Sequence, residues 1–248
     1  MTQAAPSGVR GRTLFISDLH LDESRPAGIE AFERLLETVV PGCDHLYILG
    51  DLFEYWVGDD GLDLPLPARA AEALFAAAVR TPISFMHGNR DFLVAERFAA
   101  ETGVKLIADP TVLDLYGTPT VLLHGDTLCT GDVAYQKFRA QVRDPAWQAA
   151  ALARPREERV ATALRMRADS EGAKLGKGYD IMDVTPEAVE RAFAESGCDV
   201  MIHGHTHRPG RHVHEVAGRE RVRWVLNDWY ERAGYLEATP AGIRATCF

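Results

Sequence analysis

The sequence predicts an α/β sandwich in which helices cover β-sheets, and three observations support this fold class. Short aliphatic runs alternate with stretches of helical periodicity over much of the chain. Residues 211–248 change to strand-like runs separated by turn residues. Acidic, amide or imidazole side chains follow five of the apolar runs directly, as expected where the strands of an α/β sheet end at a ligand-binding edge.

Individual elements follow from the same patterns. Strands are predicted at residues 13–17, 45–49, 83–86, 112–115, 120–123 and 199–202. Helices are predicted at residues 29–39, 68–80 and 92–102, each followed by a proline or a glycine. A Thr-Pro-Glu sequence at residues 185–187 is typical of a helix start, with the threonine as N-cap, and this helix is expected to end near Gly197.

A long segment at about residues 130–183 has little strand character. It shows helical periodicity at residues 132–143, 146–152 and 156–168, and it is rich in arginine and lysine. We interpret it as a helical insertion that forms a lid over the site. The whole chain, residues 1–248, is then expected to be one domain carrying this insertion.

Composition and charge exclude several classes of protein. The chain has 248 residues and a formal net charge of −9, so its overall charge gives no basic footprint for nucleic acid. Its four cysteines are far apart and predict no disulfide framework. No apolar run reaches the about 18 residues of a membrane span, and no signal peptide is evident. We therefore expect a cytoplasmic protein with neither a nucleic-acid partner nor an obligate protein partner.

Five short motifs supply side chains that bind metal ions: Asp18-Leu19-His20, Gly50-Asp51, Gly88-Asn89-Arg90-Asp91, His124-Gly125-Asp126 and His203-Gly204-His205. A carboxylate such as that of Asp51 can bridge two ions, and mixed nitrogen and oxygen donors suit Mn, Fe, Zn or Co. Two ions about 3.5–4 Å apart can activate a water and hold a phosphoryl group. Each motif is weak alone, but together they predict a hydrolase of phosphate bonds. His207 is given a supporting role, because the pair His203 and His205 fits one strand-end loop better.

These motifs, in this order, resemble those of the calcineurin-like metallophosphoesterases over residues 13–205. The resemblance implies a four-layer α/β/β/α sandwich with a dinuclear metal site. It implies one ion held by Asp18, His20, Asp51 and His205, and a second held by Asp51, Asn89, His124 and His203. The residues expected to take part in catalysis are Asp51, Asn89, Arg90 and His124.

Arg90 departs from the broad family pattern, which has a histidine, often cast as a general acid, at this position. Arginine stays protonated and cannot act as that acid, but it can hold a phosphate with two hydrogen bonds. An enzyme without the acid suits a good leaving group, such as a phosphate monoester with a second pKa of about 6. Arg90 therefore favours a diphosphate substrate.

Longer segments resemble the UDP-2,3-diacylglucosamine diphosphatase family, namely residues 14–21, 47–54, 87–93, 124–130, 166–168, 181–184 and 202–209. The resemblance implies that water attacks the α phosphorus, giving UMP and 2,3-diacylglucosamine 1-phosphate on the route to lipid A. It implies manganese as the metal and a peripheral position on the cytoplasmic face of the inner membrane. It also implies substrate contacts from Asn89, Arg90, Asp132, Ser170, Lys174, Lys177 and His203.

Two questions stay open at this level. The lid segment fits either a groove for acyl chains, built from Ala150, Leu152, Val160 and Leu164, or a solvated amphipathic helix. The fold also admits another activity, such as a cyclic nucleotide phosphodiesterase, a nuclease or a nucleotide pyrophosphatase. A non-catalytic interaction module on the same fold is a further alternative, although no metal ligand is missing here.

Overall fold

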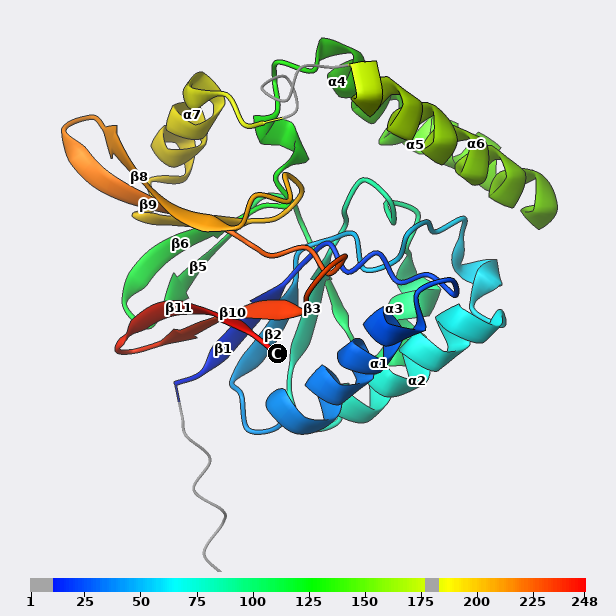
Figure 1. The fold of residues 1–248 in the computed structure, drawn as a ribbon, viewed down its shortest axis with the longest axis horizontal. Helices are drawn as coiled ribbons and strands as arrows, with labels where there is room; N and C mark the ends of the chain where they lie inside the picture. Colours follow the sequence, from blue (N-terminus) through cyan, green and yellow to red (C-terminus); the bar gives the residue numbers. More distant parts are fainter. Residues whose placement is uncertain (1–10, 177–182) are drawn as a thin grey trace, which may run out of the picture.

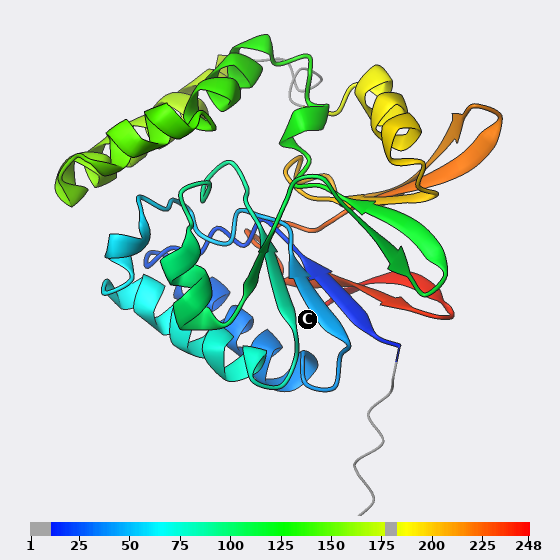
Figure 2. The same cartoon turned by 180° about the vertical axis from the view of Figure 1, so that it is seen from behind.

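The computed structural model describes residues 11–176 and 183–248, with side chains described through residue 168 in the first range. Two β-sheets pack face to face, and helices cover both outer faces (Figure 1, Figure 2). The first sheet has the order β11-β10-β1-β2-β3-β4 and the second has the order β5-β6-β7-β9-β8. This is the predicted four-layer α/β/β/α sandwich, and the prediction is confirmed.

The strands of the first sheet are β1 (Thr13–Ile16), β2 (His45–Ile48), β3 (Ile83–Met86), β4 (Lys105–Ile107), β10 (Gly234–Thr239) and β11 (Gly242–Cys247). Those of the second are β5 (Thr111–Leu115), β6 (Thr118–Leu122), β7 (Val200–His203), β8 (Gly210–Val216) and β9 (Arg219–Val225). Strands β1 to β4 are mutually parallel, as are β6, β7 and β9. Parallel strands end at a common edge, so the residues that follow β1, β2 and β3 meet there.

Helices α1 (Pro26–Arg34), α2 (Pro65–Ala78) and α3 (Glu96–Thr102) cover the first sheet, and α7 (Pro186–Ser196) covers the second (Figure 1). Helix α1 continues into a π-helical turn at Leu35–Val39. Strand β1 shows why a strand buried on both faces is apolar at successive positions. Leu14 and Ile16 pack toward the helices, whereas Phe15 packs between the sheets, because successive side chains of a strand point to opposite faces.

Three helices form the insertion over the motif-bearing edge: α4 (Val133–Val142), α5 (Pro145–Leu152) and α6 (Arg156–Gly176) (Figure 1). The Arg159 guanidinium ties α6 to the core, since it donates to the Asp60 carboxylate and to the Val57 carbonyl. Arg143 at the end of α4 donates to the Gly88 carbonyl at 2.8 Å. Among the described parts of the chain, no helix has the length and apolar character needed to cross a membrane.

Helix boundaries differ by several residues from the sequence prediction, and one strand was missed. Helix α3 begins at Glu96 and not at residue 92, because the Asp59 carboxylate accepts hydrogen bonds from the N–H groups of Ala95 and Phe98. A distant loop thus sets this helix start. Strand β4 was not predicted, since it has three residues and an exposed Lys105 at its start. Thr185 is the N-cap of α7 as predicted, although its side chain makes no capping hydrogen bond.

Packing of α7 on the second sheet gives a direct test of the fold. Phe193 is fully buried in that layer, whereas Phe75 on α2 is 53% exposed. We expect Phe193→Ala to lower the free energy of unfolding by about 3–5 kcal/mol through lost burial and a residual cavity. Phe75→Ala, the matched control, should change it by less than about 1 kcal/mol. Urea unfolding followed by circular dichroism measures both, and equal effects would contradict this packing.

Candidate metal centre and substrate cavity

The first group of metal-binding side chains consists of Asp18, His20 and His207. Asp18 and His20 follow β1, and His207 lies on the loop after β7. The Nε2 atoms of His20 and His207 are 3.3 Å apart, and Asp18 Oδ1 lies 3.9 Å and 3.4 Å from them respectively. Three donor atoms therefore converge within a space that one ion would fill.

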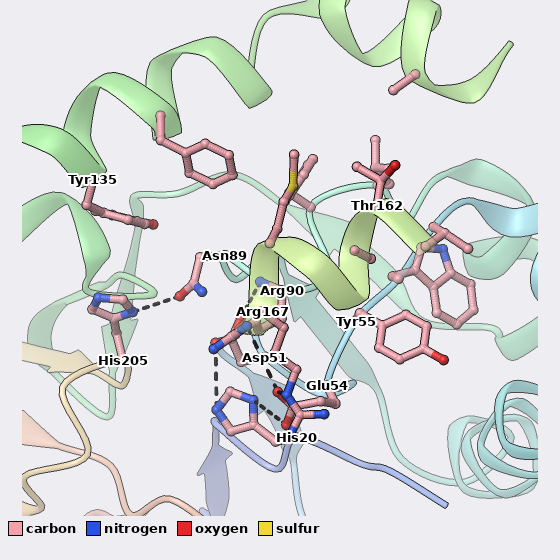
Figure 3. A pocket seen from close by; sticks show the side chains of 18 of the residues that line it. His20, Asp51, Glu54, Tyr55, Asn89, Arg90, Tyr135, Thr162, Arg167 and His205 are labelled. Carbon is pink, nitrogen blue, oxygen red and sulfur yellow. Dashed lines mark hydrogen bonds and ion pairs between the residues drawn. The ribbon is translucent and has the colours of Figure 1, made fainter. Parts of the chain in front are cut away.

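A second group brings together Asp51, His124 and His205, and Asn89 contacts both histidines, as Figure 3 shows for His205. The amide oxygen of Asn89 lies 3.0 Å from His124 Nε2 and 2.8 Å from His205 Nδ1. His124 Nδ1 contacts the Leu49 carbonyl at 2.8 Å. A carbonyl can only accept, so Nδ1 carries a proton and Nε2 is the ring nitrogen that faces the group, where it could bind an ion.

Asp51 lies between the two groups. Its Oδ2 is 3.8 Å from His20 Nε2 in the first group, and its Oδ1 is 3.8 Å from His124 Nε2 in the second. The Arg90 backbone N–H donates to Oδ1 at 2.8 Å and fixes the carboxylate plane. One carboxylate thus faces both groups, which is the arrangement a bridging ligand requires.

Backbone conformation at these positions is unusual. Asp18, His20, Asp51, His205 and His207 have φ values between 48° and 68°, a region that non-glycine residues rarely adopt. Hydrogen bonds between the loops hold this conformation: the Asp18 N–H donates to the Gly50 carbonyl at 3.1 Å and the His20 N–H to the Asp51 carbonyl at 2.9 Å. The His205 N–H donates to Asp18 Oδ2 at 2.8 Å. The strained loops therefore support one another.

Gly88 and Asp91 of the third motif each have a role in the structure. A Cβ on Gly88 would lie 2.1 Å from Asp51 Oδ1, so only glycine allows this carboxylate to sit against the loop. The fully buried Asp91 carboxylate accepts from the Gly88 N–H at 2.8 Å and from the Leu52 N–H at 2.7 Å. Asp91 therefore joins the loop after β2 to the loop after β3 and is a structural residue.

The pKa values of the donor side chains indicate that added positive charge would stabilise the site. Burial, with the neighbouring Asp91 and Asp18 carboxylates, raises the pKa of Asp51 to about 7, and this outweighs the lowering effect of His124. Burial lowers the pKa of His124, but the carboxylates of Asp51, Asp126 and Asp18 outweigh it and raise that pKa to about 9. Burial, together with His124, lowers the pKa of His205 to about 3 and keeps its ring neutral. A cation beside Asp51 would stabilise its charged form.

These residues fit divalent cations. Asp18 Oδ1 is buried without a hydrogen-bond partner among the described residues, although it is aimed at the first group. An unpaired buried carboxylate oxygen is costly unless an ion or a proton satisfies it. The donor set mixes imidazole nitrogens with carboxylate and amide oxygens, which suits transition metals better than Ca²⁺ or Mg²⁺. Two ions, one at each group, account for every donor atom described above.

A family model for calcineurin-like phosphoesterases matches residues 11–209. The chain belongs to this family. It is 51% identical over 239 residues to a UDP-2,3-diacylglucosamine hydrolase of Xanthomonas campestris pv. campestris (strain B100), covering 93% of this chain and 96% of the relative. A protein of the same name from Cellvibrio japonicus (strain Ueda107) is 50% identical over 232 residues, with the same coverage. Family membership supports the predicted metal-dependent hydrolase.

The structure corrects the predicted place of His203. Its Nε2 lies 3.0 Å from the buried Arg223 guanidinium, which can only donate, and its Nδ1 lies 2.8 Å from the Gly204 carbonyl. Both ring nitrogens are thus engaged away from the two groups. Burial and Arg223 lower the pKa of His203 to about 3. The physical reason is that β7 extends through His203, so its side chain belongs to the sheet and not to the loop beyond.

The structure also places the two histidines that follow His203 differently from the sequence prediction. His207, to which the sequence assigned a supporting role, lies in the first group, and His205 lies in the second group and not in the first. Both pairs, 203 with 205 and 205 with 207, have the same spacing in the sequence. The spacing therefore carried no signal that could separate them, and only the end of β7 does so.

A cavity of about 1120 Å³ extends from the two groups to the inner face of the lid (Figure 3). Asn89, Arg90 and Asp132 line it, as the sequence predicts for a common substrate site, but their substrate contacts stay predictions. Asp132 also accepts from the Tyr135 N–H and caps α4. The side chains of Ser170 and Lys174 lie outside the described residues, although both positions are on α6. Lys177 lies outside the described residues altogether.

Most of the lining beyond the polar end is apolar. Of the four residues predicted to form an acyl groove, Ala150 lines the cavity, whereas Leu152 and Leu164 are 41% and 46% exposed. The apolar side chains that do line it come from the core as well as the lid: Val57, Leu93, Phe138, Trp147, Ala151 and Met166. The acyl groove therefore stays a prediction, and of its four proposed residues only Ala150 is among the described residues that line the cavity, because the lid helices turn other faces inward.

Metal binding should distinguish the two histidines. We expect His207→Ala to reduce bound Mn²⁺ from two ions to one per chain, because it removes a donor atom from the first group. His203→Gln, which keeps a hydrogen-bond acceptor for Arg223, should retain both ions. Equilibrium dialysis with elemental analysis measures the stoichiometry, and circular dichroism confirms folding. Loss of an ion from the His203 variant, with both kept in the His207 variant, would contradict the assignment.

Proposed function

We propose that this chain hydrolyses the pyrophosphate bond of UDP-2,3-diacylglucosamine to UMP and 2,3-diacylglucosamine 1-phosphate, a step in lipid A biosynthesis. One observation carries the proposal: two donor groups that share Asp51 stand at the polar end of a large cavity whose remaining lining is mainly apolar. A substrate with a diphosphate at one end and acyl chains at the other matches this division. The names of the 50–51% identical relatives support the same substrate.

The dimensions of the cavity favour a lipid over a small nucleotide. Its volume of about 1120 Å³ exceeds the about 300–1,000 Å³ typical of small-molecule pockets. Phe138 and Trp147 on the lid and Leu93 on the core supply apolar surface to the walls of the cavity. Acyl chains between these walls would be removed from water, which stabilises binding by about 25 cal/mol per Å² of buried apolar surface.

We propose Mn²⁺ as the metal, because the mixed nitrogen and oxygen donor set suits it. The first ion would be held by Asp18, His20, Asp51 and His207, and the second by Asp51, Asn89, His124 and His205. Such cations would lower the pKa of a bound water and neutralise phosphoryl oxygens.

Residues of the chain then orient the substrate for hydrolysis of its pyrophosphate bond. The water oxygen bonds to the α phosphorus, the bond from that phosphorus to the bridging oxygen breaks, and the bridging oxygen leaves with the sugar phosphate. Arg90 lines the cavity and can hold the departing phosphate through its guanidinium. It cannot protonate the leaving group, but a phosphate monoester with a second pKa of about 6 needs no such acid.

We also propose that the protein works at the cytoplasmic face of the inner membrane as a peripheral protein. The substrate's acyl chains must pass from a bilayer into the cavity beneath the lid. Supporting this, the lid exposes several large apolar side chains: Val133, Leu152, Leu164 and Met166. Vesicle flotation with and without the substrate lipid tests this localisation.

The reaction itself is tested by product analysis in ¹⁸O-labelled water. We expect the purified protein with Mn²⁺ to convert UDP-2,3-diacylglucosamine to the two products, with the label in UMP because the α phosphorus is attacked. Mass spectrometry of both products locates the label. Label in the sugar phosphate would move the attack to the other phosphorus. No turnover of this lipid, with hydrolysis of a cyclic nucleotide or DNA instead, would overturn the proposed function.

The shared carboxylate gives a second test. We expect Asp51→Ala to reduce kcat at least about a hundredfold, because one residue serves both ions and their spacing depends on it. Asp114→Ala, an exposed acid on β5, serves as the control and should keep wild-type activity. Steady-state kinetics at saturating Mn²⁺ measures kcat of both variants. Activity of the Asp51 variant within tenfold of wild type would contradict the bridging role.

A further inference from the structure

Glu54 is a buried carboxylate beside the metal centre for which the proposed reaction gives no role. It lies three residues after Asp51, and only 2% of it is exposed. Its backbone N–H donates to the Leu21 carbonyl at 3.1 Å, one residue beyond His20. The Glu54 side chain is thereby fixed between the loop that carries Asp51 and the loop that carries His20.

Three arginines from distant segments surround this carboxylate. Arg167 of α6 lies closest, with Nε 3.1 Å from Glu54 Oε1. Arg90 NH1 is 4.0 Å from the same oxygen, and Arg25 NH2 is 3.7 Å from Oε2. Figure 3 shows Arg90, Arg167 and Glu54 side by side next to His20. Only Arg90 was identified from the sequence, because nothing in the spacing of residues 25, 54 and 167 indicates that they meet.

Other contacts keep Arg25 and Arg167 in place. The Arg25 guanidinium lies over the Tyr230 ring, 4.5 Å from its centroid, and donates to the His20 carbonyl. Arg167 also faces Asp22, with NH1 3.6 Å from Oδ2. Three guanidinium groups, from Arg25, Arg90 and Arg167, thus gather around the Glu54 carboxylate. Guanidinium groups so close together repel one another unless a carboxylate stands between them.

We propose that Glu54 is a positioning residue that holds Arg25, Arg90 and Arg167 together as a subsite for the phosphate that is not attacked. This inference rests on the proposed function, because it needs a substrate with two linked phosphates. The Arg90 N–H contacts the bridging Asp51 carboxylate, so the subsite begins where the donor groups end. A phosphate held between the donor groups places its neighbour, one oxygen away, against these guanidinium groups.

Glu54 sets the geometry of this subsite, whereas the arginines bind the anion. Without the carboxylate, mutual repulsion should drive the arginines apart toward solvent, since their side chains are 15–30% exposed. A different role for Glu54 predicts the opposite effect on phosphate binding. If Glu54 only competed with the phosphate for the arginines, its neutralisation would tighten anion binding. The two roles therefore predict changes of opposite sign.

Inorganic phosphate binding to the metal-free protein tests the subsite without turnover. We expect isothermal titration calorimetry to detect phosphate binding to the wild type. Glu54→Gln should weaken this binding about tenfold, which corresponds to the loss of one charge-assisted contact between an arginine and the phosphate. Glu23→Gln, a substitution of the same kind at an exposed position, is the matched control and should bind as the wild type does. Unchanged or tighter binding by the Glu54 variant, or none by the wild type, would overturn the proposal.

Kinetics at saturating Mn²⁺ separate positioning from general damage to the metal centre. For the diphosphate lipid, Glu54→Gln should raise KM about tenfold while two bound Mn²⁺ ions are retained. A fall in kcat with loss of an ion and an unchanged KM would instead mean that Glu54 supports His20, and would overturn the subsite.

Arg25→Gln provides a second variant in case Glu54→Gln fails to fold. It leaves Glu54 in place and should weaken phosphate binding about threefold to tenfold, whereas binding equal to wild type would remove Arg25 from the subsite and contradict the proposal as stated. If phosphate binding depends on Glu54 but the lipid is not hydrolysed, the proposed function fails and the anion subsite stands. If the lipid is hydrolysed but phosphate binding does not depend on Glu54, the proposed function stands and the subsite fails.

Discussion

The buried carboxylate of Asp51 is the constraint on which the rest of the site depends. Its two oxygens face different donor groups, each 3.8 Å from a histidine nitrogen, and burial raises its pKa to about 7. A charge removed from water in this way needs compensating positive charge close by. The surrounding loops hold it in place: Gly88 leaves room for it, and the Arg90 N–H fixes its plane. Two divalent cations would complete this arrangement.

The lid is connected to the metal-binding loops through hydrogen bonds at its base. Tyr135 and Arg139 on α4 donate to Asp126 Oδ2 at 2.6 Å and 2.8 Å, and Asp126 lies two residues after His124. Arg143 donates to Gly88, the residue before Asn89. On α6, Arg167 reaches Glu54 beside His20. The helices that cover the cavity thus contact the loops that carry the donors, so lid position and donor geometry are linked.

Three histidines of one motif show how burial and neighbours divide chemical roles. His203 ends β7 and accepts from Arg223, which keeps it neutral and structural. His205 and His207 lie beyond the strand in left-handed conformations and face different donor groups. Side chains of the same type, two residues apart, therefore serve one packing role and two sites that fit metal ions. The deciding factor is the point at which the strand ends and the chain turns.

The sequence by itself determined the fold class, the edge at which the site forms, and six of the seven residues predicted as metal ligands that the structure brings together there, from Asp18 to His205. Local patterns suffice for these because apolar periodicity defines buried strands, and parallel strands must share an edge. Only the tertiary structure decided that His207, and not His203, lies in one of the two donor groups, that Asp59 sets the start of α3, and that Arg25 and Arg167 meet at Glu54. These depend on contacts between segments far apart in the chain, and spacing within one segment carries no information about them.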